Sequence, residues 1–376
     1  MPAPKHVMLN ALYLAPGVSG GPETYLRGLV PALAGGFPDL RLTVATTRSG
    51  AAALNADGWR ELATIAPFDC EDGQRARRQW AEQVELPRAA RAAGAQIVHS
   101  LASIAPIRAG ARSVVTLHDV TFLLTDTFGP LTTFGMGTLI KLGARRADAL
   151  ITATQAARGQ ICSVLGIAPA RLAVVPHGYA PAPAGEHTPA ELVRDRYELD
   201  AGRVVLCVAA KRPHKNQELL VRAARLLPDD VLVVLAGHPE PYEQTLRRLA
   251  RELGVQERVR FVGYVPDADL EGLWDVCACA AFPTLGEGFG IPVLEAFAHG
   301  VPVAASDLPV LREVGGELPH YFDPRDPASA AQAIRAAMQD AGAAAMGPAH
   351  ARRYSWQAAA QGTNEVYERV LHASGR

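Results

Sequence analysis

The chain has 376 residues, 49% of them apolar, and a formal net charge of −1 at pH 7. This length is enough for two ordinary domains with well-buried cores. The near-zero charge argues against nucleic acid as the main partner, because proteins that bind it carry a clear basic excess.

The cysteine pattern and the apolar runs predict a cytoplasmic protein. Five cysteines are scattered without a CxxC or CxxH pair, which argues against disulfides and a structural zinc site. The first residues lack the pattern of a signal peptide, and no apolar run approaches the roughly 20 residues that span a bilayer.

Short apolar runs alternate with amphipathic stretches through the first half of the chain. Strands are predicted at Val7–Leu14, Leu40–Ala45, Ile97–Val98, Ser113–Leu117, Ala149–Thr152 and Leu172–Val175. The clearest helix of this half is predicted at Glu23–Leu33. Such alternation is typical of α/β domains with a parallel sheet covered on both faces.

After residues 176–189, which are rich in Pro, Gly and Ala, the alternation resumes. Strands are predicted at Val204–Val208, Val231–Ala236, Val259–Val262, Cys277–Phe282 and Val301–Ala304, and helices at Gln217–Leu227, Tyr242–Leu253 and Pro292–His299. We therefore predict two Rossmann-like, doubly wound α/β domains facing across a cleft. The expected bounds are 1–178 for the N-terminal domain, 179–202 for a linker, 203–353 for the C-terminal domain and 354–376 for a terminal helix.

Two candidate site features of the first half follow predicted strands. Gly20 and Gly21 precede a helix, where glycines let the backbone approach a phosphate or sugar closely, although many strand-to-helix turns contain glycine. His118 follows the strand Ser113–Leu117 and can serve as a hydrogen-bond partner or general base. An equally good interpretation is that this histidine satisfies loop carbonyls.

The second half places a basic turn and two glutamates after strands. Lys211, Arg212, His214 and Lys215 crowd the start of a helix, which favours an anionic ligand such as a diphosphate over a merely solvated turn. Farther along, the segment 286-GEGFGIPVLEAFAHGVPVAASD-307 follows a strand. Its glycines let backbone N–H groups face a phosphate, and Pro292 fits the first turn of a helix, where its missing N–H costs nothing.

Glu287 lies before that helix and Glu295 one turn inside it, so the two carboxylates have different tasks. One accepting from a ribose diol and the other from a sugar hydroxyl would explain both. Metal ligation is less favoured, because no third acidic ligand lies nearby in the sequence.

The run from Glu287 to Ala296 resembles the E-x7-E motif of the retaining, GT-B-fold glycosyltransferases of family 4. The resemblance extends over nearly the whole chain through Gly-Gly-Pro-Glu-Thr from residue 20, Thr-Leu-His-Asp from 116, Val-Val-Pro-His-Gly from 174 and Pro-His-Lys-Asn from 213. It implies a nucleotide-diphosphate-sugar donor bound by the second domain and an acceptor bound by the first. It also implies that no metal or other cofactor is needed.

The resemblance implies roles for single residues. Lys215 and the amides around Gly288, Phe289, Gly290 and Ile291 would bind the diphosphate. Glu295 would bind the ribose, and the backbone at Tyr264 and Val265 would contact the base. Glu287 would contact hydroxyls of the transferred sugar, and His118 would lie at the reacting centre. Gly20 and Gly21 would lie beside the acceptor. The terminal helix would cross back to the first domain.

The sequence departs from the family pattern at two places. Many members carry an arginine where Ala210 stands, and we expect Arg212, rather than Lys211, to replace it. The usual Asn-Gly after Val-Pro is here His177-Gly178, a change expected to affect the hinge.

Three other functions and several acceptors stay open. A sugar phosphorylase or a sugar-nucleotide epimerase could use the same fold, and a two-domain sugar-binding protein is the alternative without turnover. The motif variants favour GDP-mannose or a related deoxyhexose donor over a UDP-sugar. The acceptor would be a glycan, a lipid-linked sugar or a small molecule. The arginine-rich stretch 75–91 leaves peripheral contact with the inner face of a membrane open, but Glu82 and Glu85 favour a solvated helix.

Overall fold

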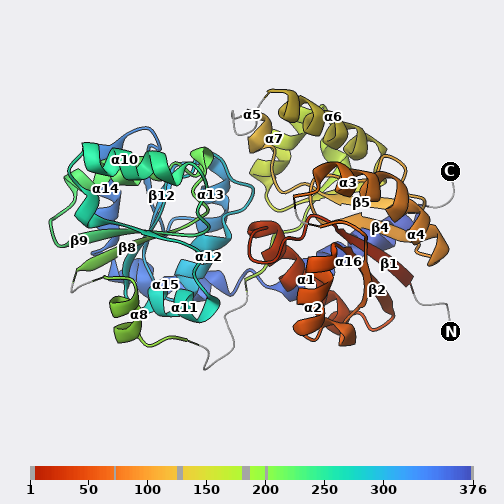
Figure 1. Cartoon of the computed structure of the whole chain (residues 1–376), viewed down its shortest axis with the longest axis horizontal. Helices are drawn as coiled ribbons and strands as arrows, with labels where there is room; N and C mark the ends of the chain where they lie inside the picture. The colour runs from red at the N-terminus through yellow and green to blue at the C-terminus, as the bar shows by residue number, and fades with distance from the viewer. Residues whose placement is uncertain (1–4, 72, 125–129, 180–186, 200–201, 374–376) are drawn as a thin grey trace. The chain divides into compact units, whose positions relative to one another are not determined.

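A computed structural model describes residues 5–71, 73–124, 130–179, 187–199 and 202–373. The chain folds into two compact units (Figure 1). Unit 1 comprises residues 1–178 and 354–376, and unit 2 comprises residues 179–353. The C-terminal segment thus belongs with the N-terminal half of the chain.

Unit 1 is built on a seven-stranded parallel sheet with the order β3-β2-β1-β4-β5-β6-β7. Its strands are β1 (Lys5–Ala11), β2 (Leu40–Thr46), β3 (Thr64–Pro67), β4 (Ile97–Ser100), β5 (Arg112–Thr116), β6 (Ala149–Thr152) and β7 (Leu172–Val174). The central strands are buried on both faces, which explains their continuous apolar runs.

Helices cover both faces of this sheet. One face carries α1 (Gly21–Gly36), α2 (Arg48–Ala56) and α16 (Trp356–His372), and its core includes Leu9, Tyr25, Trp356 and Tyr367. The remaining helices are α3 (Arg75–Trp80), α4 (Leu86–Ala92), α5 (Thr121–Leu124), α6 (Pro130–Arg146) and α7 (Gln155–Leu165). A single core therefore joins α16 to the first helix of the chain.

The stretch 75–91 is not one solvated helix. A π-helical turn, Ala81–Glu85, interrupts it between α3 and α4. Glu82 lies in this turn and is only 3% exposed, with its carboxylate 3.5 Å from the Asn10 amide. Because this side chain is buried, the interpretation that Glu82 belongs to a solvated helix is wrong.

Unit 2 is built on a six-stranded parallel sheet with the order β10-β9-β8-β11-β12-β13. Its strands are β8 (Arg203–Val208), β9 (Val231–Ala236), β10 (Val259–Val262), β11 (Cys277–Phe282), β12 (Val303–Ser306) and β13 (His320–Phe322). Both units are doubly wound, so the predicted fold class, two Rossmann-like α/β domains, is confirmed.

Helices lie on both faces of the second sheet as well (Figure 1). They are α8 (Ala190–Arg196), α9 (Gln217–Ala223), α10 (Glu243–Glu252), α11 (Asp267–Asp275), α12 (Ile291–Ala298), α13 (Pro309–Gly315), α14 (Pro327–Ala337) and α15 (Ala341–Ala351). One core cluster packs α9, α10 and α14 on the sheet through Leu220, Leu246 and Ile334.

Part of the range expected to be linker, 179–202, is folded structure of unit 2. Helix α8 packs on α11, and Val193 is fully buried. The buried carboxylate of Asp269 accepts hydrogen bonds from Thr188, Arg196 and Tyr197. The linker prediction is therefore wrong for residues 190–196. The composition of this segment does not indicate these hydrogen bonds, because they depend on residues distant in the sequence.

Candidate active site

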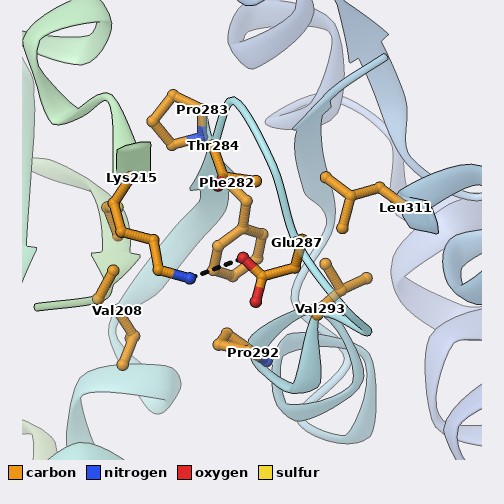
Figure 2. Close-up of a pocket in the computed structure, with 12 residues that line it drawn as sticks. Val208, Lys215, Phe282, Pro283, Thr284, Glu287, Pro292, Val293 and Leu311 are labelled. Atoms are coloured by element: carbon orange, nitrogen blue, oxygen red, sulfur yellow. Dashed lines mark hydrogen bonds and ion pairs between the residues drawn. The ribbon is translucent and has the colours of Figure 1, made fainter. Parts of the chain in front are cut away.

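The carboxyl ends of β8 and β11 lie where the strand order of the six-stranded sheet reverses. Open parallel sheets bind ligands at such points, because the loops leaving the two strands diverge. A pocket opens there, entirely within unit 2 (Figure 2). It is lined by Cys207, Val208, Ala209, Lys215, Phe282, Pro283, Thr284, Glu287, Gly290, Pro292, Val293 and Leu311.

Three predicted site residues, Lys215, Glu287 and Gly290, come together in this pocket. The Lys215 ammonium and the Glu287 carboxylate point toward each other, and Nζ lies 2.6 Å from Oε2 (Figure 2). The two side chains are 25% and 20% exposed, so solvent screens the ion pair only partly. A ligand that enters the pocket meets one cation and one anion in direct contact.

The loops that carry these two residues are bonded to each other. The Leu285 N–H donates to the carbonyl oxygen of His214 at 2.8 Å, and the Thr284 hydroxyl lies 3.1 Å from the same oxygen. Asn216, held at φ 55°, donates from its amide to the Pro283 carbonyl at 2.9 Å. The backbone positions of Lys215 and Glu287 are thus fixed relative to each other.

Gly290 sets the start of α12. Its φ of 94° is in the left-handed region, and a Cβ there would lie 2.8 Å from the Leu311 side chain. Only glycine fits both constraints. Ile291 and Pro292 then begin the helix, whose dipole favours an anion at this end, while Phe289 is buried beside it.

Glu295 lies one turn into α12 and is half-buried. Burial, and then the carboxylates of Glu271 and Asp267 on α11, raise the pKa of Glu295 to about 7. Near neutral pH this group is close to half-ionised. Hydrogen-bond donors such as a diol would favour its charged form.

The basic turn before α9 divides into different roles. Lys211 is fully buried; its ammonium donates to the carbonyls of Gly237, at 2.6 Å, and Val262, and lies 3.5 Å from Glu243. Burial lowers the pKa of Lys211, which here fastens the ends of β9 and β10. Arg212 donates to Glu240 at 2.8 Å and does not line the pocket.

The predicted base-binding residues follow β10, at the same edge of the sheet. Tyr264 is 57% exposed, whereas Val265 is buried. The Gly237 N–H donates to the carbonyl of Gly263 at 3.0 Å and so links this loop to the end of β9.

In unit 1, Gly20 and Gly21 lie at the start of α1, as predicted. Gly20 has φ 59° and caps the helix, and a Cβ on Gly21 would meet nothing within 4 Å. Buried Glu23 accepts from the Gly17 N–H at 3.0 Å and from Arg27 at 2.9 Å, which shapes this loop.

His118 follows β5 and has both ring nitrogens engaged within unit 1. Its Nε2 lies 2.8 Å from the carbonyl oxygen of Leu101, and its Nδ1 lies 3.2 Å from Nε2 of His177. Burial lowers the pKa of both histidines, so they are neutral at pH 7. The histidine thus satisfies a loop carbonyl, and its place at the reacting centre stays a prediction.

Three residues that shape the candidate site or orient His118 were not identified from the sequence. Thr284 and Leu311 shape the pocket through a loop contact and a packing contact, which no motif signals. His177 had a signal, its departure from the family's Asn-Gly, but the expected effect was on the hinge and not on His118.

Within the described part of the chain, no group of three or more His, Cys, Asp or Glu side chains is arranged to hold a metal ion. In the same residues, no helix is both long and apolar enough to cross a membrane.

Two family models match successive parts of the chain. The model for Glycosyltransferase Family 4 matches residues 19–182, and the model for Glycosyl transferases group 1 matches residues 191–355. A structure of Alr3699/HepE from Anabaena, solved with UDP and glucose, superposes with a TM-score of 0.76 at 20% identity, covering 97% of this chain and 99% of that one.

Curated relatives include the O-antigen chain mannosyltransferase B of Escherichia coli, 28% identical over 68% of this chain and 70% of its own length. A GDP-mannose-dependent alpha-(1-6)-phosphatidylinositol monomannoside mannosyltransferase of Mycolicibacterium smegmatis is 33% identical over 54% of this chain and 55% of its own. For another relative the match spans only 30% of that protein's length. The paired family models and the two-unit fold together assign this chain to the family 4 glycosyltransferases of GT-B fold.

Proposed function

We propose that the chain is a retaining hexosyltransferase that moves a sugar from a nucleoside-diphosphate sugar to an acceptor hydroxyl. The observation that carries this proposal is the pocket at the ends of β8 and β11, where Lys215, Glu287 and the start of α12 converge. A cation and helix N–H groups suit a diphosphate, and a carboxylate beside them suits sugar hydroxyls.

In this proposal the site works by electrostatic preorganisation. Lys215 and the amides from Gly288 to Ile291 stabilise the negative charge that develops on the departing diphosphate. Glu295 accepts from the ribose diol, Tyr264 and Val265 contact the base, and the transfer needs no metal. The acceptor attacks from the face that the diphosphate leaves, so the anomeric configuration is retained without a carboxylate nucleophile.

The preferred donor is GDP-mannose or a related deoxyhexose donor, and the acceptor is a glycan or a lipid-linked sugar in polysaccharide biosynthesis. The mannosyltransferase relatives support this choice, since their names specify an O-antigen chain and a phosphatidylinositol mannoside. The structural neighbour solved with UDP makes a UDP-sugar the competing donor. The five cysteines are free, which suits a reaction in the cytoplasm.

A nucleotide screen by thermal shift tests the donor class. Because a ligand that binds only the folded state raises its apparent stability, GDP and GDP-mannose should raise Tm more than UDP, ADP, TDP and their sugars. A transfer assay with the stabilising donor, with the product's anomeric configuration read by NMR, then tests retention. Failure of every nucleotide to stabilise folded protein would reject the transferase and favour a sugar-binding protein. A sugar phosphate formed with inorganic phosphate as acceptor would instead identify a phosphorylase, and an epimerised donor a sugar-nucleotide epimerase.

A further inference from the structure

In the Lys215–Glu287 ion pair, the two side chains that the proposed reaction needs for its substrate bind each other instead. Their separation is 2.6 Å, and both line the pocket (Figure 2). A diphosphate that binds Lys215 must compete with Glu287 for the same ammonium group. It must also accept a carboxylate as a neighbour of like charge.

The frame around the pair determines how this competition proceeds. Leu285 and Thr284 hold the Glu287 loop to the carbonyl of His214, and Asn216 holds the Lys215 turn to the carbonyl of Pro283. None of these three hydrogen bonds involves the Lys215 ammonium or the Glu287 carboxylate. The two side chains can therefore exchange partners by rotating about their own bonds while the loops stay bonded.

The pocket offers few charged groups, which strengthens the competition between Glu287 and a diphosphate for Lys215. Among the described residues that line it, Lys215 is the one cation and Glu287 the one anion. Ala210 carries no charge, and Arg212 is paired with Glu240 outside the pocket. A diphosphate thus has no other lining ammonium or guanidinium group to use.

We infer that Glu287 is a specificity residue that makes the site prefer the intact donor over the nucleoside-diphosphate product, an inference that rests on the proposed function. When a nucleoside diphosphate binds alone, Glu287 loses its cation and receives nothing in exchange. When the sugar is attached, its hydroxyls donate to the released carboxylate. The carboxylate therefore penalises the product and not the substrate, which favours product release after transfer.

The test compares GDP with GDP-mannose, and UDP with UDP-glucose, by isothermal titration calorimetry on the full chain and on Glu287→Gln. The substitution keeps the shape and removes the charge. We expect the nucleoside diphosphate to bind roughly two- to fivefold more tightly, the range for releasing a partly screened charge pair. In Glu287→Gln, the ratio of the nucleoside-diphosphate Kd to the donor Kd should therefore be lower than in the native chain. An unchanged or weaker affinity for the nucleoside diphosphate would overturn the inference.

A double-mutant cycle separates the ion pair from simple repulsion between Glu287 and phosphate. If the pair is the cause, Glu287→Gln gives no gain in affinity when Lys215 is already alanine. A gain that persists in that background would refute the inference. Glu252→Gln, an equal change of charge in an exposed pair on α10, controls for net charge and should leave both affinities unchanged. A native chain that binds none of these nucleotides would instead reject the proposed function itself.

Discussion

His118 and His177 form a hydrogen-bonded pair whose proton positions follow from their other partners. The carbonyl of Leu101 can only accept, so the proton of His118 is on Nε2 and its Nδ1 accepts from Nε2–H of His177. The His177 ring is stacked on Trp356, with ring centroids 6.2 Å apart, and also contacts the Tyr25 ring in a tilted arrangement at 4.6 Å. His177, which precedes the last residue of this segment of unit 1, thus fixes the ring orientation of His118, the predicted catalytic histidine.

Replacing His177 should therefore act through His118. His177→Ala removes the donor to Nδ1 and should lower kcat about three- to tenfold, the usual effect of one lost hydrogen bond, with little change in the donor KM. His177→Asn can still donate and should retain most of the activity. Steady-state kinetics of both variants make the comparison, and equal losses in the two would show that packing, not the hydrogen bond, matters.

Lys215→Ala should weaken binding of the nucleoside diphosphate by about 1.5–3 kcal/mol, because a charge-assisted contact to phosphate is lost. Calorimetry with the preferred nucleotide measures the change. Lys141→Ala, on α6 in unit 1, provides the matched control and should bind normally. Unchanged affinity in Lys215→Ala would remove this lysine from the donor site.

Glu295 should make both stability and nucleotide binding depend on pH. Its folded-state pKa of about 7 lies above its ordinary value of 4.5, so the unfolded chain ionises first and stability falls as pH rises from about 4.5 to 7. Glu295→Gln should consequently raise Tm at pH 8 and change it little at pH 4.5. Thermal melts across this range check the sign.

The same substitution should weaken nucleotide binding most at high pH, where the native carboxylate is ionised and accepts from the ribose diol. A variant that binds as well as the native chain at pH 8 would contradict the assignment of Glu295 to the ribose. Greater stability together with weaker binding is the expected signature of a functional carboxylate in an unfavourable environment.

Two glycines on α1 should respond oppositely to alanine. A Cβ on Gly28 would lie 1.9 Å from the Trp356 ring, whereas a Cβ on Gly35 meets nothing within 4 Å. Gly28→Ala should destabilise the chain by about 1–3 kcal/mol through overpacking. Gly35→Ala should be neutral or stabilise it by up to about 1 kcal/mol through helix propensity. Denaturant unfolding curves compare the two, and similar stabilities would refute the tight contact between α1 and α16.

The central strands were predictable because burial on both faces leaves continuous apolar runs, as at Val231–Ala236, where the prediction and β9 coincide. The edge strands β3 and β13 were missed, since they are short and only partly buried. Periodicity within a segment contains no information about such pairing, which depends on the neighbouring strand.

At the site, the sequence indicated which residues gather at the ends of β8 and β11, because parallel strands end at one edge. It did not distinguish Lys211 from Lys215. The first is buried against backbone carbonyls and the second lines the pocket, although they are four positions apart. The pairing of Lys215 with Glu287 likewise depends on contacts between two distant loops.

The placement of α16 in the core of unit 1 has a consequence for synthesis of the protein. Trp356 and Tyr367 fill space against Gly28 and His99, but the ribosome makes them only after all of unit 2. Unit 2 is one continuous segment and has its whole core available earlier. The half of the chain made first is therefore the half completed last, and until α16 is made the apolar residues that it covers stay without their native contacts.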